Sequence, residues 1–214
     1  MEHVMNNSTE NKTKLGLLAS SCLMAMNVSA ADEAALYDNA PADSAFVRII
    51  NNNGDKAVSA QVGEKLLFSE GYCQASDYEY VTAGDYELKI DNKNWDGNLK
   101  ENKSYTFVVN NTQLTVIEED VFNNPKKGLF STYNLTDKDN ISVKTKGGKK
   151  AVFPEVAGNT HVSREVNPIK IDLSVYDADT VLAEIAATRF QRGQSNNLFV
   201  CGSQNKYHTS WALH

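Results

Sequence analysis

The sequence predicts an all-β protein with two tandem, related β-sandwich domains, immunoglobulin-like or jelly-roll-like, behind a signal peptide. Short runs of alternating apolar and polar residues recur at regular spacing, with Gly and Asn turns between them. The strand pattern of the first half also recurs in the second half. We place the signal peptide at residues 1–31, the N-terminal domain at 32–118, a short linker at 119–127 and the C-terminal domain at 128–214.

The first residues resemble an export signal. Lys12 and Lys14 precede the apolar stretch LGLLASSCLMAM, and small residues follow it. This order is typical of a secretory signal, and cleavage after Ala30 or Ala31 fits. The stretch is too short for a comfortable membrane span. A lipoprotein signal with Cys22 as the modified residue is the alternative, but it leaves a very short apolar region. We therefore expect the mature protein in the periplasm.

The charge of the chain limits its partners. The formal net charge is -6, and the signal segment carries equal numbers of basic and acidic residues, so the mature chain keeps that charge. A mildly acidic protein is a poor electrostatic partner for nucleic acid or anionic lipid. We expect no nucleic-acid partner, and a polyanionic polysaccharide would be weakly repelled unless a local basic patch intervenes.

Individual strands can be followed by their alternation. Residues 85–90, DYELKI, alternate apolar and polar side chains after an Ala-Gly turn. Residues 169–175, IKIDLSV, do the same, which predicts a strand with one buried face. Residues 179–190 have a helical composition, but their neighbours are all β, so we predict a strand there as well.

An internal repeat relates the two halves. AFVRIINNNGDKAVSAQV, residues 45–62, matches GLFSTYNLTDKDNISVKT, residues 128–145, as strand, Asn-led turn and strand. This match places Asn51 on Asn134. We infer two related domains.

A second block continues the repeat after a small gap. GEKLLFSE, residues 63–70, falls on GKKAVFPE, residues 148–155, which aligns Phe68 with Phe153. Each copy then closes with an apolar strand, SYTFVV in the first and NNLFV in the second.

The boundary between the copies lies in IEEDVFNNPKKG, residues 117–128. Three consecutive acids, a proline and two lysines do not favour a strand interior. We therefore expect Glu118, Glu119 and Asp120 to be solvated, without the fixed geometry that acid–base chemistry needs.

The sequence offers no catalytic set. The mature chain has only His161, His208 and His214 as histidines, and it has no Gly-x-Ser-x-Gly elbow. His208 and Ser210 would share a face if extended, which leaves a minor acetyl-transfer or esterase activity as the weakest hypothesis. No ligand spacing for a metal is present. We expect no enzymatic activity, no metal and no cofactor.

Two cysteines remain after signal removal, Cys73 and Cys201. In an oxidising compartment an even pair suggests a disulfide, which here would join the two domains. The alternative is two separate buried thiols that act as small hydrophobes.

Binding candidates come from Trp and Arg. Core packing explains most aromatic residues, but Trp95 lies in a polar hairpin and could stack on a sugar. Arginine is favoured at interfaces and in bidentate contacts with carboxylates. The expected partner-binding residues are Arg48, Arg164, Glu165, Asn167, Tyr176, Arg189 and Arg192. Internal pairing of the arginines with Glu165 is the equal alternative.

The stretch VSREVNPIKIDLSVYD, residues 162–177, concentrates several of these candidates. Pro168 should hold Asn167 extended and fix the start of the following strand. Arg164 and Glu165 would then stand just ahead of that strand, where we expect a docking edge.

The order of motifs resembles a known family. The motifs are ALYDNAPADSAFVRIINN, IEE, YNLTD, REVNPIKIDLSVYD and RGQSNNLFV, from Ala35 to about Trp211. Together they are similar to the AlgF family of periplasmic alginate O-acetylation proteins. The resemblance carries no catalytic residues, and the cysteine pair is not part of the family pattern.

The resemblance implies a non-catalytic adaptor of two β-sandwich-like domains that links acetyltransferase components. Its implied partners are SGNH-type acetyltransferases of the AlgJ and AlgX kind and the membrane-bound O-acyltransferase system. The alternatives are a carbohydrate-binding module that presents the polymer, or a helper for acetylation of another exopolysaccharide such as cellulose.

Overall fold

The structure is a computed structural model, and it describes residues 40–213. The regular elements assigned within these residues are all strands, numbered β1 to β16, and this confirms the predicted all-β class. Residues 40–213 contain no helix that could cross a membrane. The predicted signal peptide at residues 1–31, and with it the alternative at Cys22, lies outside the described residues.

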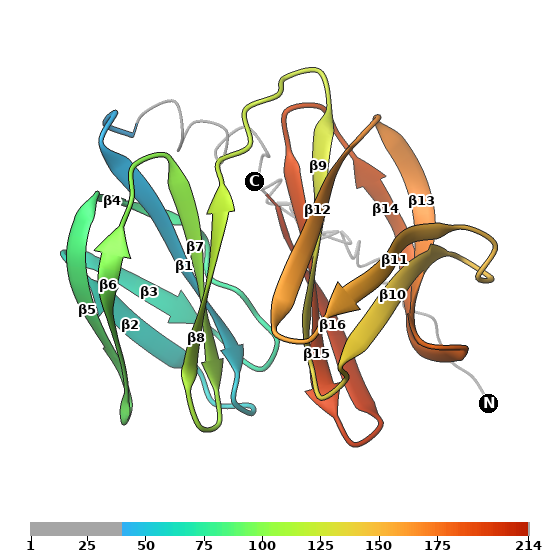
Figure 1. Cartoon of the computed structure of the whole chain (residues 1–214), viewed down its shortest axis with the longest axis horizontal. Coiled ribbons are helices and arrows are strands. Elements are labelled where there is room, and N and C mark those ends of the chain that lie inside the picture. Colours follow the sequence, from blue (N-terminus) through green and yellow to red (C-terminus); the bar gives the residue numbers. More distant parts are fainter. Residues whose placement is uncertain (1–39, 214) are drawn as a thin grey trace, which may run out of the picture.

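The first domain is built from eight strands in two layers (Figure 1). One layer has the order β4-β1-β7-β8, in which β1 and β7 run parallel. The hairpins β2–β3 and β5–β6 form the other layer, where β2 and β5 are neighbours. The bounds are β1 Ser44–Asn52, β2 Val58–Val62, β3 Lys65–Ser69, β4 Glu79–Thr82, β5 Gly84–Ile90, β6 Lys93–Leu99, β7 Lys103–Asn110 and β8 Leu114–Asp120.

The second domain repeats this plan. One sheet has the order β12-β9-β15-β16, with β9 and β15 parallel, and the other has the order β11-β10-β13-β14. The bounds are β9 Gly128–Thr136, β10 Asn140–Thr145, β11 Ala151–Ala157, β12 Thr160–Val166, β13 Ile169–Asp177, β14 Thr180–Phe190, β15 Ser195–Ser203 and β16 Lys206–Leu213. Strand β14 confirms that residues 179–190 form a strand rather than a helix.

The two strand orders correspond one to one, which confirms the internal repeat. Asn51 and Asn134 lie near the ends of the equivalent strands β1 and β9, and both are fully buried. Each side-chain oxygen accepts a hydrogen bond from the backbone two residues later, and each amide nitrogen donates to two backbone carbonyls. A buried asparagine therefore closes the same turn in both copies.

One detail of the predicted alignment is wrong. Phe153 is 5% exposed and lies in the second core, whereas Phe68 is 53% exposed. Ala60 and Val143 are equivalent positions of the repeat. Ala60 pairs with Leu67 and Val143 pairs with Phe153, so Leu67, not Phe68, is the structural counterpart of Phe153. The pairing of β10 and β11 contains register shifts that β2 and β3 lack. Since neighbours on a strand point to opposite faces, a shift of one residue reverses burial.

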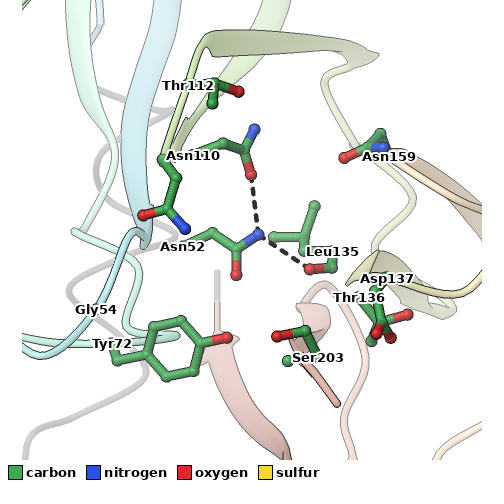
Figure 2. A pocket seen from close by; sticks show the side chains of 12 residues that line it. Asn52, Gly54, Tyr72, Asn110, Thr112, Leu135, Thr136, Asp137, Asn159 and Ser203 are labelled. Atoms are coloured by element: carbon green, nitrogen blue, oxygen red, sulfur yellow. Dashed lines mark hydrogen bonds between the residues drawn. The ribbon is translucent and has the colours of Figure 1, made fainter.

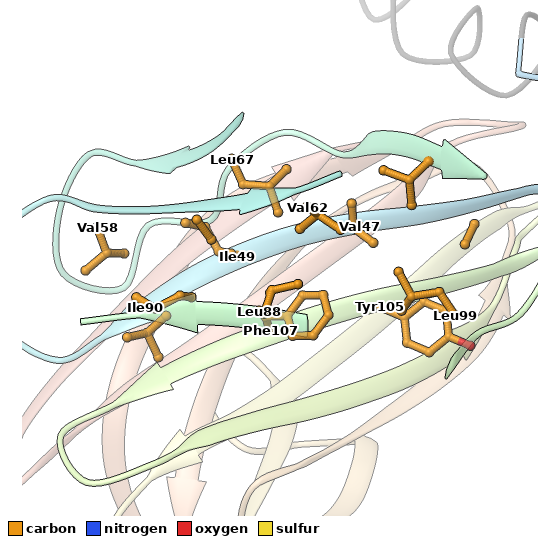
Figure 3. Packing of buried hydrophobic residues seen from close by; sticks show 14 residues of the cluster. Val47, Ile49, Val58, Val62, Leu67, Leu88, Ile90, Leu99, Tyr105 and Phe107 are labelled. Carbon is orange, nitrogen blue, oxygen red and sulfur yellow. The ribbon is translucent and has the colours of Figure 1, made fainter. Parts of the chain in front are cut away.

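Each domain encloses its own apolar core. In the first domain, aliphatic and aromatic side chains from the β1–β7 layer meet those of the two hairpins (Figure 3). The second core is similar and gathers Phe130, Phe153, Phe190 and Trp211 around its aliphatic residues. Burial of these side chains is the main force that holds each sandwich together.

Candidate functional site: the junction between the domains

A third apolar cluster lies between the two sandwiches rather than inside either one. The sheets that contain β1 and β9 meet through the faces opposite to their own cores (Figure 1). The buried members are Ile50, Cys73, Val108 and Ile117 from the first domain and Tyr133, Leu135, Phe199 and Cys201 from the second. Both faces of each sheet are therefore covered, which explains the continuous burial of β1, β7, β9 and β15.

A disulfide crosses this junction. Cys73 and Cys201 are bonded, their Cα atoms lie 5.8 Å apart, and both are buried. Of the two alternatives that the sequence left open, the structure therefore has the inter-domain disulfide and not two separate thiols. The bond links positions 128 residues apart, so it removes much conformational freedom from the unfolded chain.

The side chain of Arg48 is fully buried in the junction. Its Nε donates to Thr106 Oγ1 at 2.9 Å, and its Nη2 donates to Tyr133 Oη at 2.8 Å. Its guanidinium carbon also lies 4.3 Å from the ring centre of Tyr78 and 4.8 Å from that of Phe199. The guanidinium of the first domain is therefore inserted between aromatic rings of both domains.

Glu119 supplies the negative charge beside this arginine. Its Oε2 lies 3.9 Å from Arg48 Nη2, and the Tyr133 hydroxyl donates a hydrogen bond to the same carboxylate. His161 Nε2 lies 3.3 Å from the other oxygen, Oε1. Burial raises the pKa of Tyr133 well above its ordinary value, which keeps the hydroxyl protonated and able to donate. Arg48 opposes this rise in pKa, and Glu119 adds to it.

The three acids of the predicted boundary segment are part of strand β8, where Glu118 and Asp120 are exposed to solvent as expected and Glu119 is not. Alternation along β8 turns Glu119 toward the second domain, where its side chain is only 10% exposed. Glu118 and Asp120 point the other way and pair with Lys100 and Lys103. The expectation of a solvated carboxylate without fixed geometry was wrong for Glu119, because Arg48, Tyr133 and His161 hold it at the junction.

Arg48 was expected to bind a partner, and the structure corrects this expectation. The residue has no exposed surface and pairs across the domain junction. The local sequence could not reveal this arrangement, because the face that covers Arg48 belongs to strands far along the chain.

Other predicted partner-binding residues lie on or next to β12, an edge strand of its sheet. Arg164 Nη1 donates to the carbonyl oxygen of Val152 at 3.1 Å, and Glu165 accepts from Asn124 Nδ2 at 2.9 Å. Asn167, just after the strand, accepts from Lys127 Nζ. Arg164 and Glu165 are thus strand residues, not part of a loop ahead of one.

The remaining candidates of this group are dispersed. Tyr176 is buried, with Lys144 Nζ 4.5 Å from its ring centre. Arg189 and Arg192 are exposed near the end of β14. The structure therefore does not gather the predicted partner-binding residues into one surface.

Trp95 lies mainly against the first core. Its ring meets Phe107 edge-on, with ring centres 5.1 Å apart, and it packs against the buried cluster of that domain. A Cβ atom at Gly97 would stand 2.6 Å from Trp95 Cζ2, so the ring also covers that glycine. These contacts explain the residue as part of the core rather than as a free stacking platform.

A polar cleft opens where the junction reaches the surface (Figure 2). Its volume is about 430 Å³, and a second hollow of about 440 Å³ shares Gly54, Tyr72 and Ser203 with it. The polar residues that line the two hollows are Asn52, Asp55, Tyr72, Asn110, Asn111, Thr112, Thr136, Asp137, Asn159, Ser203, Gln204, Lys206 and His208. We name this pair of hollows the junction groove.

Hydrogen bonds within each domain, and one between the domains, hold the groove in shape. Asn52 Nδ2 donates to Asn110 Oδ1 and to the carbonyl of Leu135, both at 2.9 Å. Asp137 accepts from the backbone of Gln204 and from the Tyr207 hydroxyl, and the backbone bond is the main cause of its lowered pKa. Sequence reasoning missed the groove because its residues come from separate turns of both domains.

Tyr72 lines both hollows, and Figure 2 shows its ring in the lining of the first. Its ring meets His208 edge-on at 5.3 Å. Burial raises the pKa of Tyr72, and the nearby Asp137 and Asp55 add to that rise. The charged residues that line the groove are two carboxylates, Asp55 and Asp137, and one lysine, Lys206.

His208 and Ser210 both lie on strand β16. The Ser210 hydroxyl donates to the carbonyl oxygen of Cys73 and is buried beside the disulfide. His208 is exposed and packs on Tyr72. The serine therefore serves the junction, and its hydroxyl is not aimed at a substrate.

The sequence matches the family described as "Alginate O-acetyl transferase AlgF" over residues 18–197. It is 34% identical to "Alginate biosynthesis protein AlgF" of Pseudomonas putida, covering 97% of this chain and 96% of that protein. Its identity to the protein of the same name from Azotobacter vinelandii is 33%, over 86% of this chain and 85% of the other.

One solved structure among the matches is the C-terminal domain of AlgF from P. aeruginosa. It is 29% identical, covers 42% of this chain and 99% of that domain, and has a TM-score of 0.38. The sequence matches extend over nearly the whole chain at about one-third identity. The chain therefore belongs to the AlgF family of alginate biosynthesis and O-acetylation proteins.

Proposed function

We propose that this protein is a non-catalytic periplasmic adaptor in the O-acetylation of alginate, which holds acetyltransferase components together. Family membership supplies the pathway, and the disulfide together with the family indicates a location outside the cytoplasm. The observation that supports an adaptor most is the junction, because it joins two sandwiches into one body.

An adaptor that positions two partners needs a fixed relation between its two binding faces. Here a disulfide, a buried ion pair and a shared apolar cluster connect the domains. The sheet layers that do not take part in the junction face outward on opposite sides of the molecule (Figure 1). Two partners could therefore bind at once without competing for one surface.

The partners that we propose are the SGNH-type acetyltransferases of the AlgJ-like and AlgX-like kind, together with the membrane-bound O-acyltransferase system. The described residues support this division of labour, since the only serine–histidine candidate has its hydroxyl bonded to the backbone of Cys73. The adaptor would position the acetyl-transferring proteins, and those proteins would perform the chemistry.

Biolayer interferometry with the purified AlgX-like acetyltransferase of the same bacterium tests the proposal. We expect saturable binding at micromolar protein or below. A matched control is the protein reduced and denatured, which should not bind. No measurable binding to the AlgX-like and AlgJ-like acetyltransferases, alone or mixed, would contradict the adaptor function.

A second candidate function is presentation of the polymer, and the junction groove is the feature that favours it. Its amides and the Tyr72 ring are groups that bind sugar hydroxyls. Asp55 and Asp137 would oppose an anionic uronate chain. Calorimetric titration with oligomannuronates separates the two functions: binding that Tyr72→Ala abolishes would favour presentation, and no heat of binding would remove it.

A further inference from the structure

The most exposed large apolar side chains of the described residues lie side by side on one strand. Leu66 is 68% exposed and Phe68 is 53% exposed, and both belong to β3. Leu67 between them is 1% exposed and points into the first core (Figure 3). Since successive residues of a strand alternate between faces, Leu66 and Phe68 point away from the core.

The second domain provides an internal comparison for this strand. Its equivalent, β11, buries Phe153, and its exposed residues are Ala151, Pro154, Glu155 and Ala157. Proline and charged side chains on an edge strand prevent unwanted association. Among the described strands, β3 pairs with β2 alone, yet it has two large apolar side chains where β11 has this protection.

The rest of this outward face is polar, and its charged residues on β5 and β6 are three acids and one lysine, Lys89. On β5 and β6, Glu87 lies directly opposite Asp96, and both side chains are exposed. Asp85 is exposed on the same face of β5. Like charges directly opposite each other destabilise a sheet, so this carboxylate pair weakens the fold that contains it. The face therefore combines an apolar pair at one side with three carboxylates and one lysine, a net negative charge, at the other.

We propose that the outward face of β2, β3, β5 and β6 is a docking surface for a protein that presents apolar side chains flanked by lysine or arginine. Leu66 and Phe68 would bury their side chains in the partner, and the carboxylates of Glu87 and Asp96 would pair with its cations. This inference rests on the proposed adaptor function, because it assigns one of the two faces that the adaptor needs.

The charges on the face indicate which kind of molecule could bind there. An anionic uronate polymer or an anionic lipid surface would be repelled by Glu87, Asp96 and Asp85. A second copy of this chain would bring the same carboxylates against each other. A basic, apolar protein surface is the occupant that complements both parts of the face.

A double variant, Leu66→Ser with Phe68→Ser, tests the apolar part. Its matched control is Ile169→Ser with Val181→Ser, since these residues are 51% and 46% exposed in the second domain. With the purified AlgX-like acetyltransferase as the probe, we expect the double variant to bind roughly tenfold more weakly or worse, and the control to bind normally. Both variants should keep the Tm of the wild type, because the substituted side chains lie outside the cores.

A second variant, Glu87→Lys with Asp96→Lys, tests the charges. We expect weaker binding of the same probe, and weaker dependence of the remaining binding on salt, because attraction between opposite charges has been removed. Unchanged binding by both double variants, or an equal loss in the Ile169/Val181 control, would overturn the docking surface while leaving the adaptor function intact.

If the wild-type protein does not bind the probe, the adaptor function fails with that partner, and acetylation in cells decides the surface. The measurement is the acetyl content of alginate secreted by cells that carry each variant in place of the wild-type gene. Low acetylation with the Leu66/Phe68 variant and normal acetylation with the control support the surface. Normal acetylation with both overturns it.

Discussion

The two domains share their strand order but differ in what the outward face of the equivalent hairpin exposes. Strand β3 exposes Leu66 and Phe68, whereas β11 buries Phe153 and exposes Pro154. The positions that the copies share are those that close turns and fill cores. The difference shows that duplication preserved the architecture while each outward face acquired its own chemistry.

The junction shows a second difference between the copies. Corresponding faces of β1 and β9 meet there, but Arg48 on β1 has Ser131 as its counterpart on β9 in the repeat. Ser131 shares a hydrogen bond with Ser163 in its own domain, while Arg48 reaches Tyr133 of the other. A single buried cation thus makes an otherwise symmetric contact directional.

Among the proposed substitutions, removal of the buried cation Arg48 should cause the largest loss of unfolding free energy. Arg48→Met keeps much of the side-chain volume but leaves the buried Glu119 without its cation. We expect a loss of about 3–5 kcal/mol in the free energy of unfolding, measured by urea denaturation. Adding Glu119→Gln to Arg48→Met should recover part of the loss. A loss below about 1 kcal/mol, the range for the surface pair of Lys65 and Glu79, would refute the role given to Arg48.

The register difference between the copies predicts unequal effects at two residues that the sequence repeat aligns. Phe153→Ala should cost about 3–5 kcal/mol of unfolding free energy, because it empties part of the second core. Phe68→Ala should change that free energy by less than about 0.5 kcal/mol, because the side chain is mainly in solvent. Equal losses would show that β3 and β11 have the same register after all.

The disulfide keeps the two copies together, and its removal should let them behave separately. Cys73→Ser with Cys201→Ser should lower the free energy of unfolding by about 2–4 kcal/mol. The sequence contains two tryptophans, and Trp95 packs on the first core while Trp211 packs on the second. Variants with Trp95→Phe or Trp211→Phe therefore report one domain each by fluorescence.

When the disulfide is intact, the unfolding transitions of the two single-tryptophan variants should coincide. Without the disulfide we expect two midpoints, because the domains lose the covalent part of their coupling. Coincident midpoints in the cysteine-free protein would mean that Arg48 and the apolar cluster alone suffice to couple the domains.

Much of the architecture could be predicted from the sequence, because alternation and turn residues act locally. The strand at 179–190 and the strand order of the repeat followed from such signals, whereas the two cysteines left a disulfide and separate thiols both open. The burial of Arg48 and Glu119 could not, because the surface that covers them belongs to the other domain. Likewise, a register shift within β10 and β11 leaves no mark in the sequence, so Phe68 was aligned with a buried residue.

The smallest predicted effect concerns a difference at the edge of the groove. Asp137 ties the turn after β9 to the turn after β15, and its counterpart in the repeat is Gly54, which has no carboxylate. The backbone bond from Gln204 lowers the pKa of Asp137, with the Tyr207 hydroxyl and Lys138 adding to it and burial opposing it. A carboxyl whose pKa is depressed by folding stabilises the protein above its unfolded pKa.

That stabilisation should disappear as the pH falls below about 4, through the lowered pKa of the folded state. We expect acid to destabilise the second domain in part through Asp137, and Asp137→Asn to reduce this part of the pH dependence. Urea denaturation at neutral pH and at about pH 3, followed by Trp211 in the Trp95→Phe background, measures it. The first domain, which has glycine at this position, supplies the comparison: if Asp137→Asn changes the acid response of Trp95 as much as that of Trp211, the aspartate does not act locally, and the difference between the domains must have another origin.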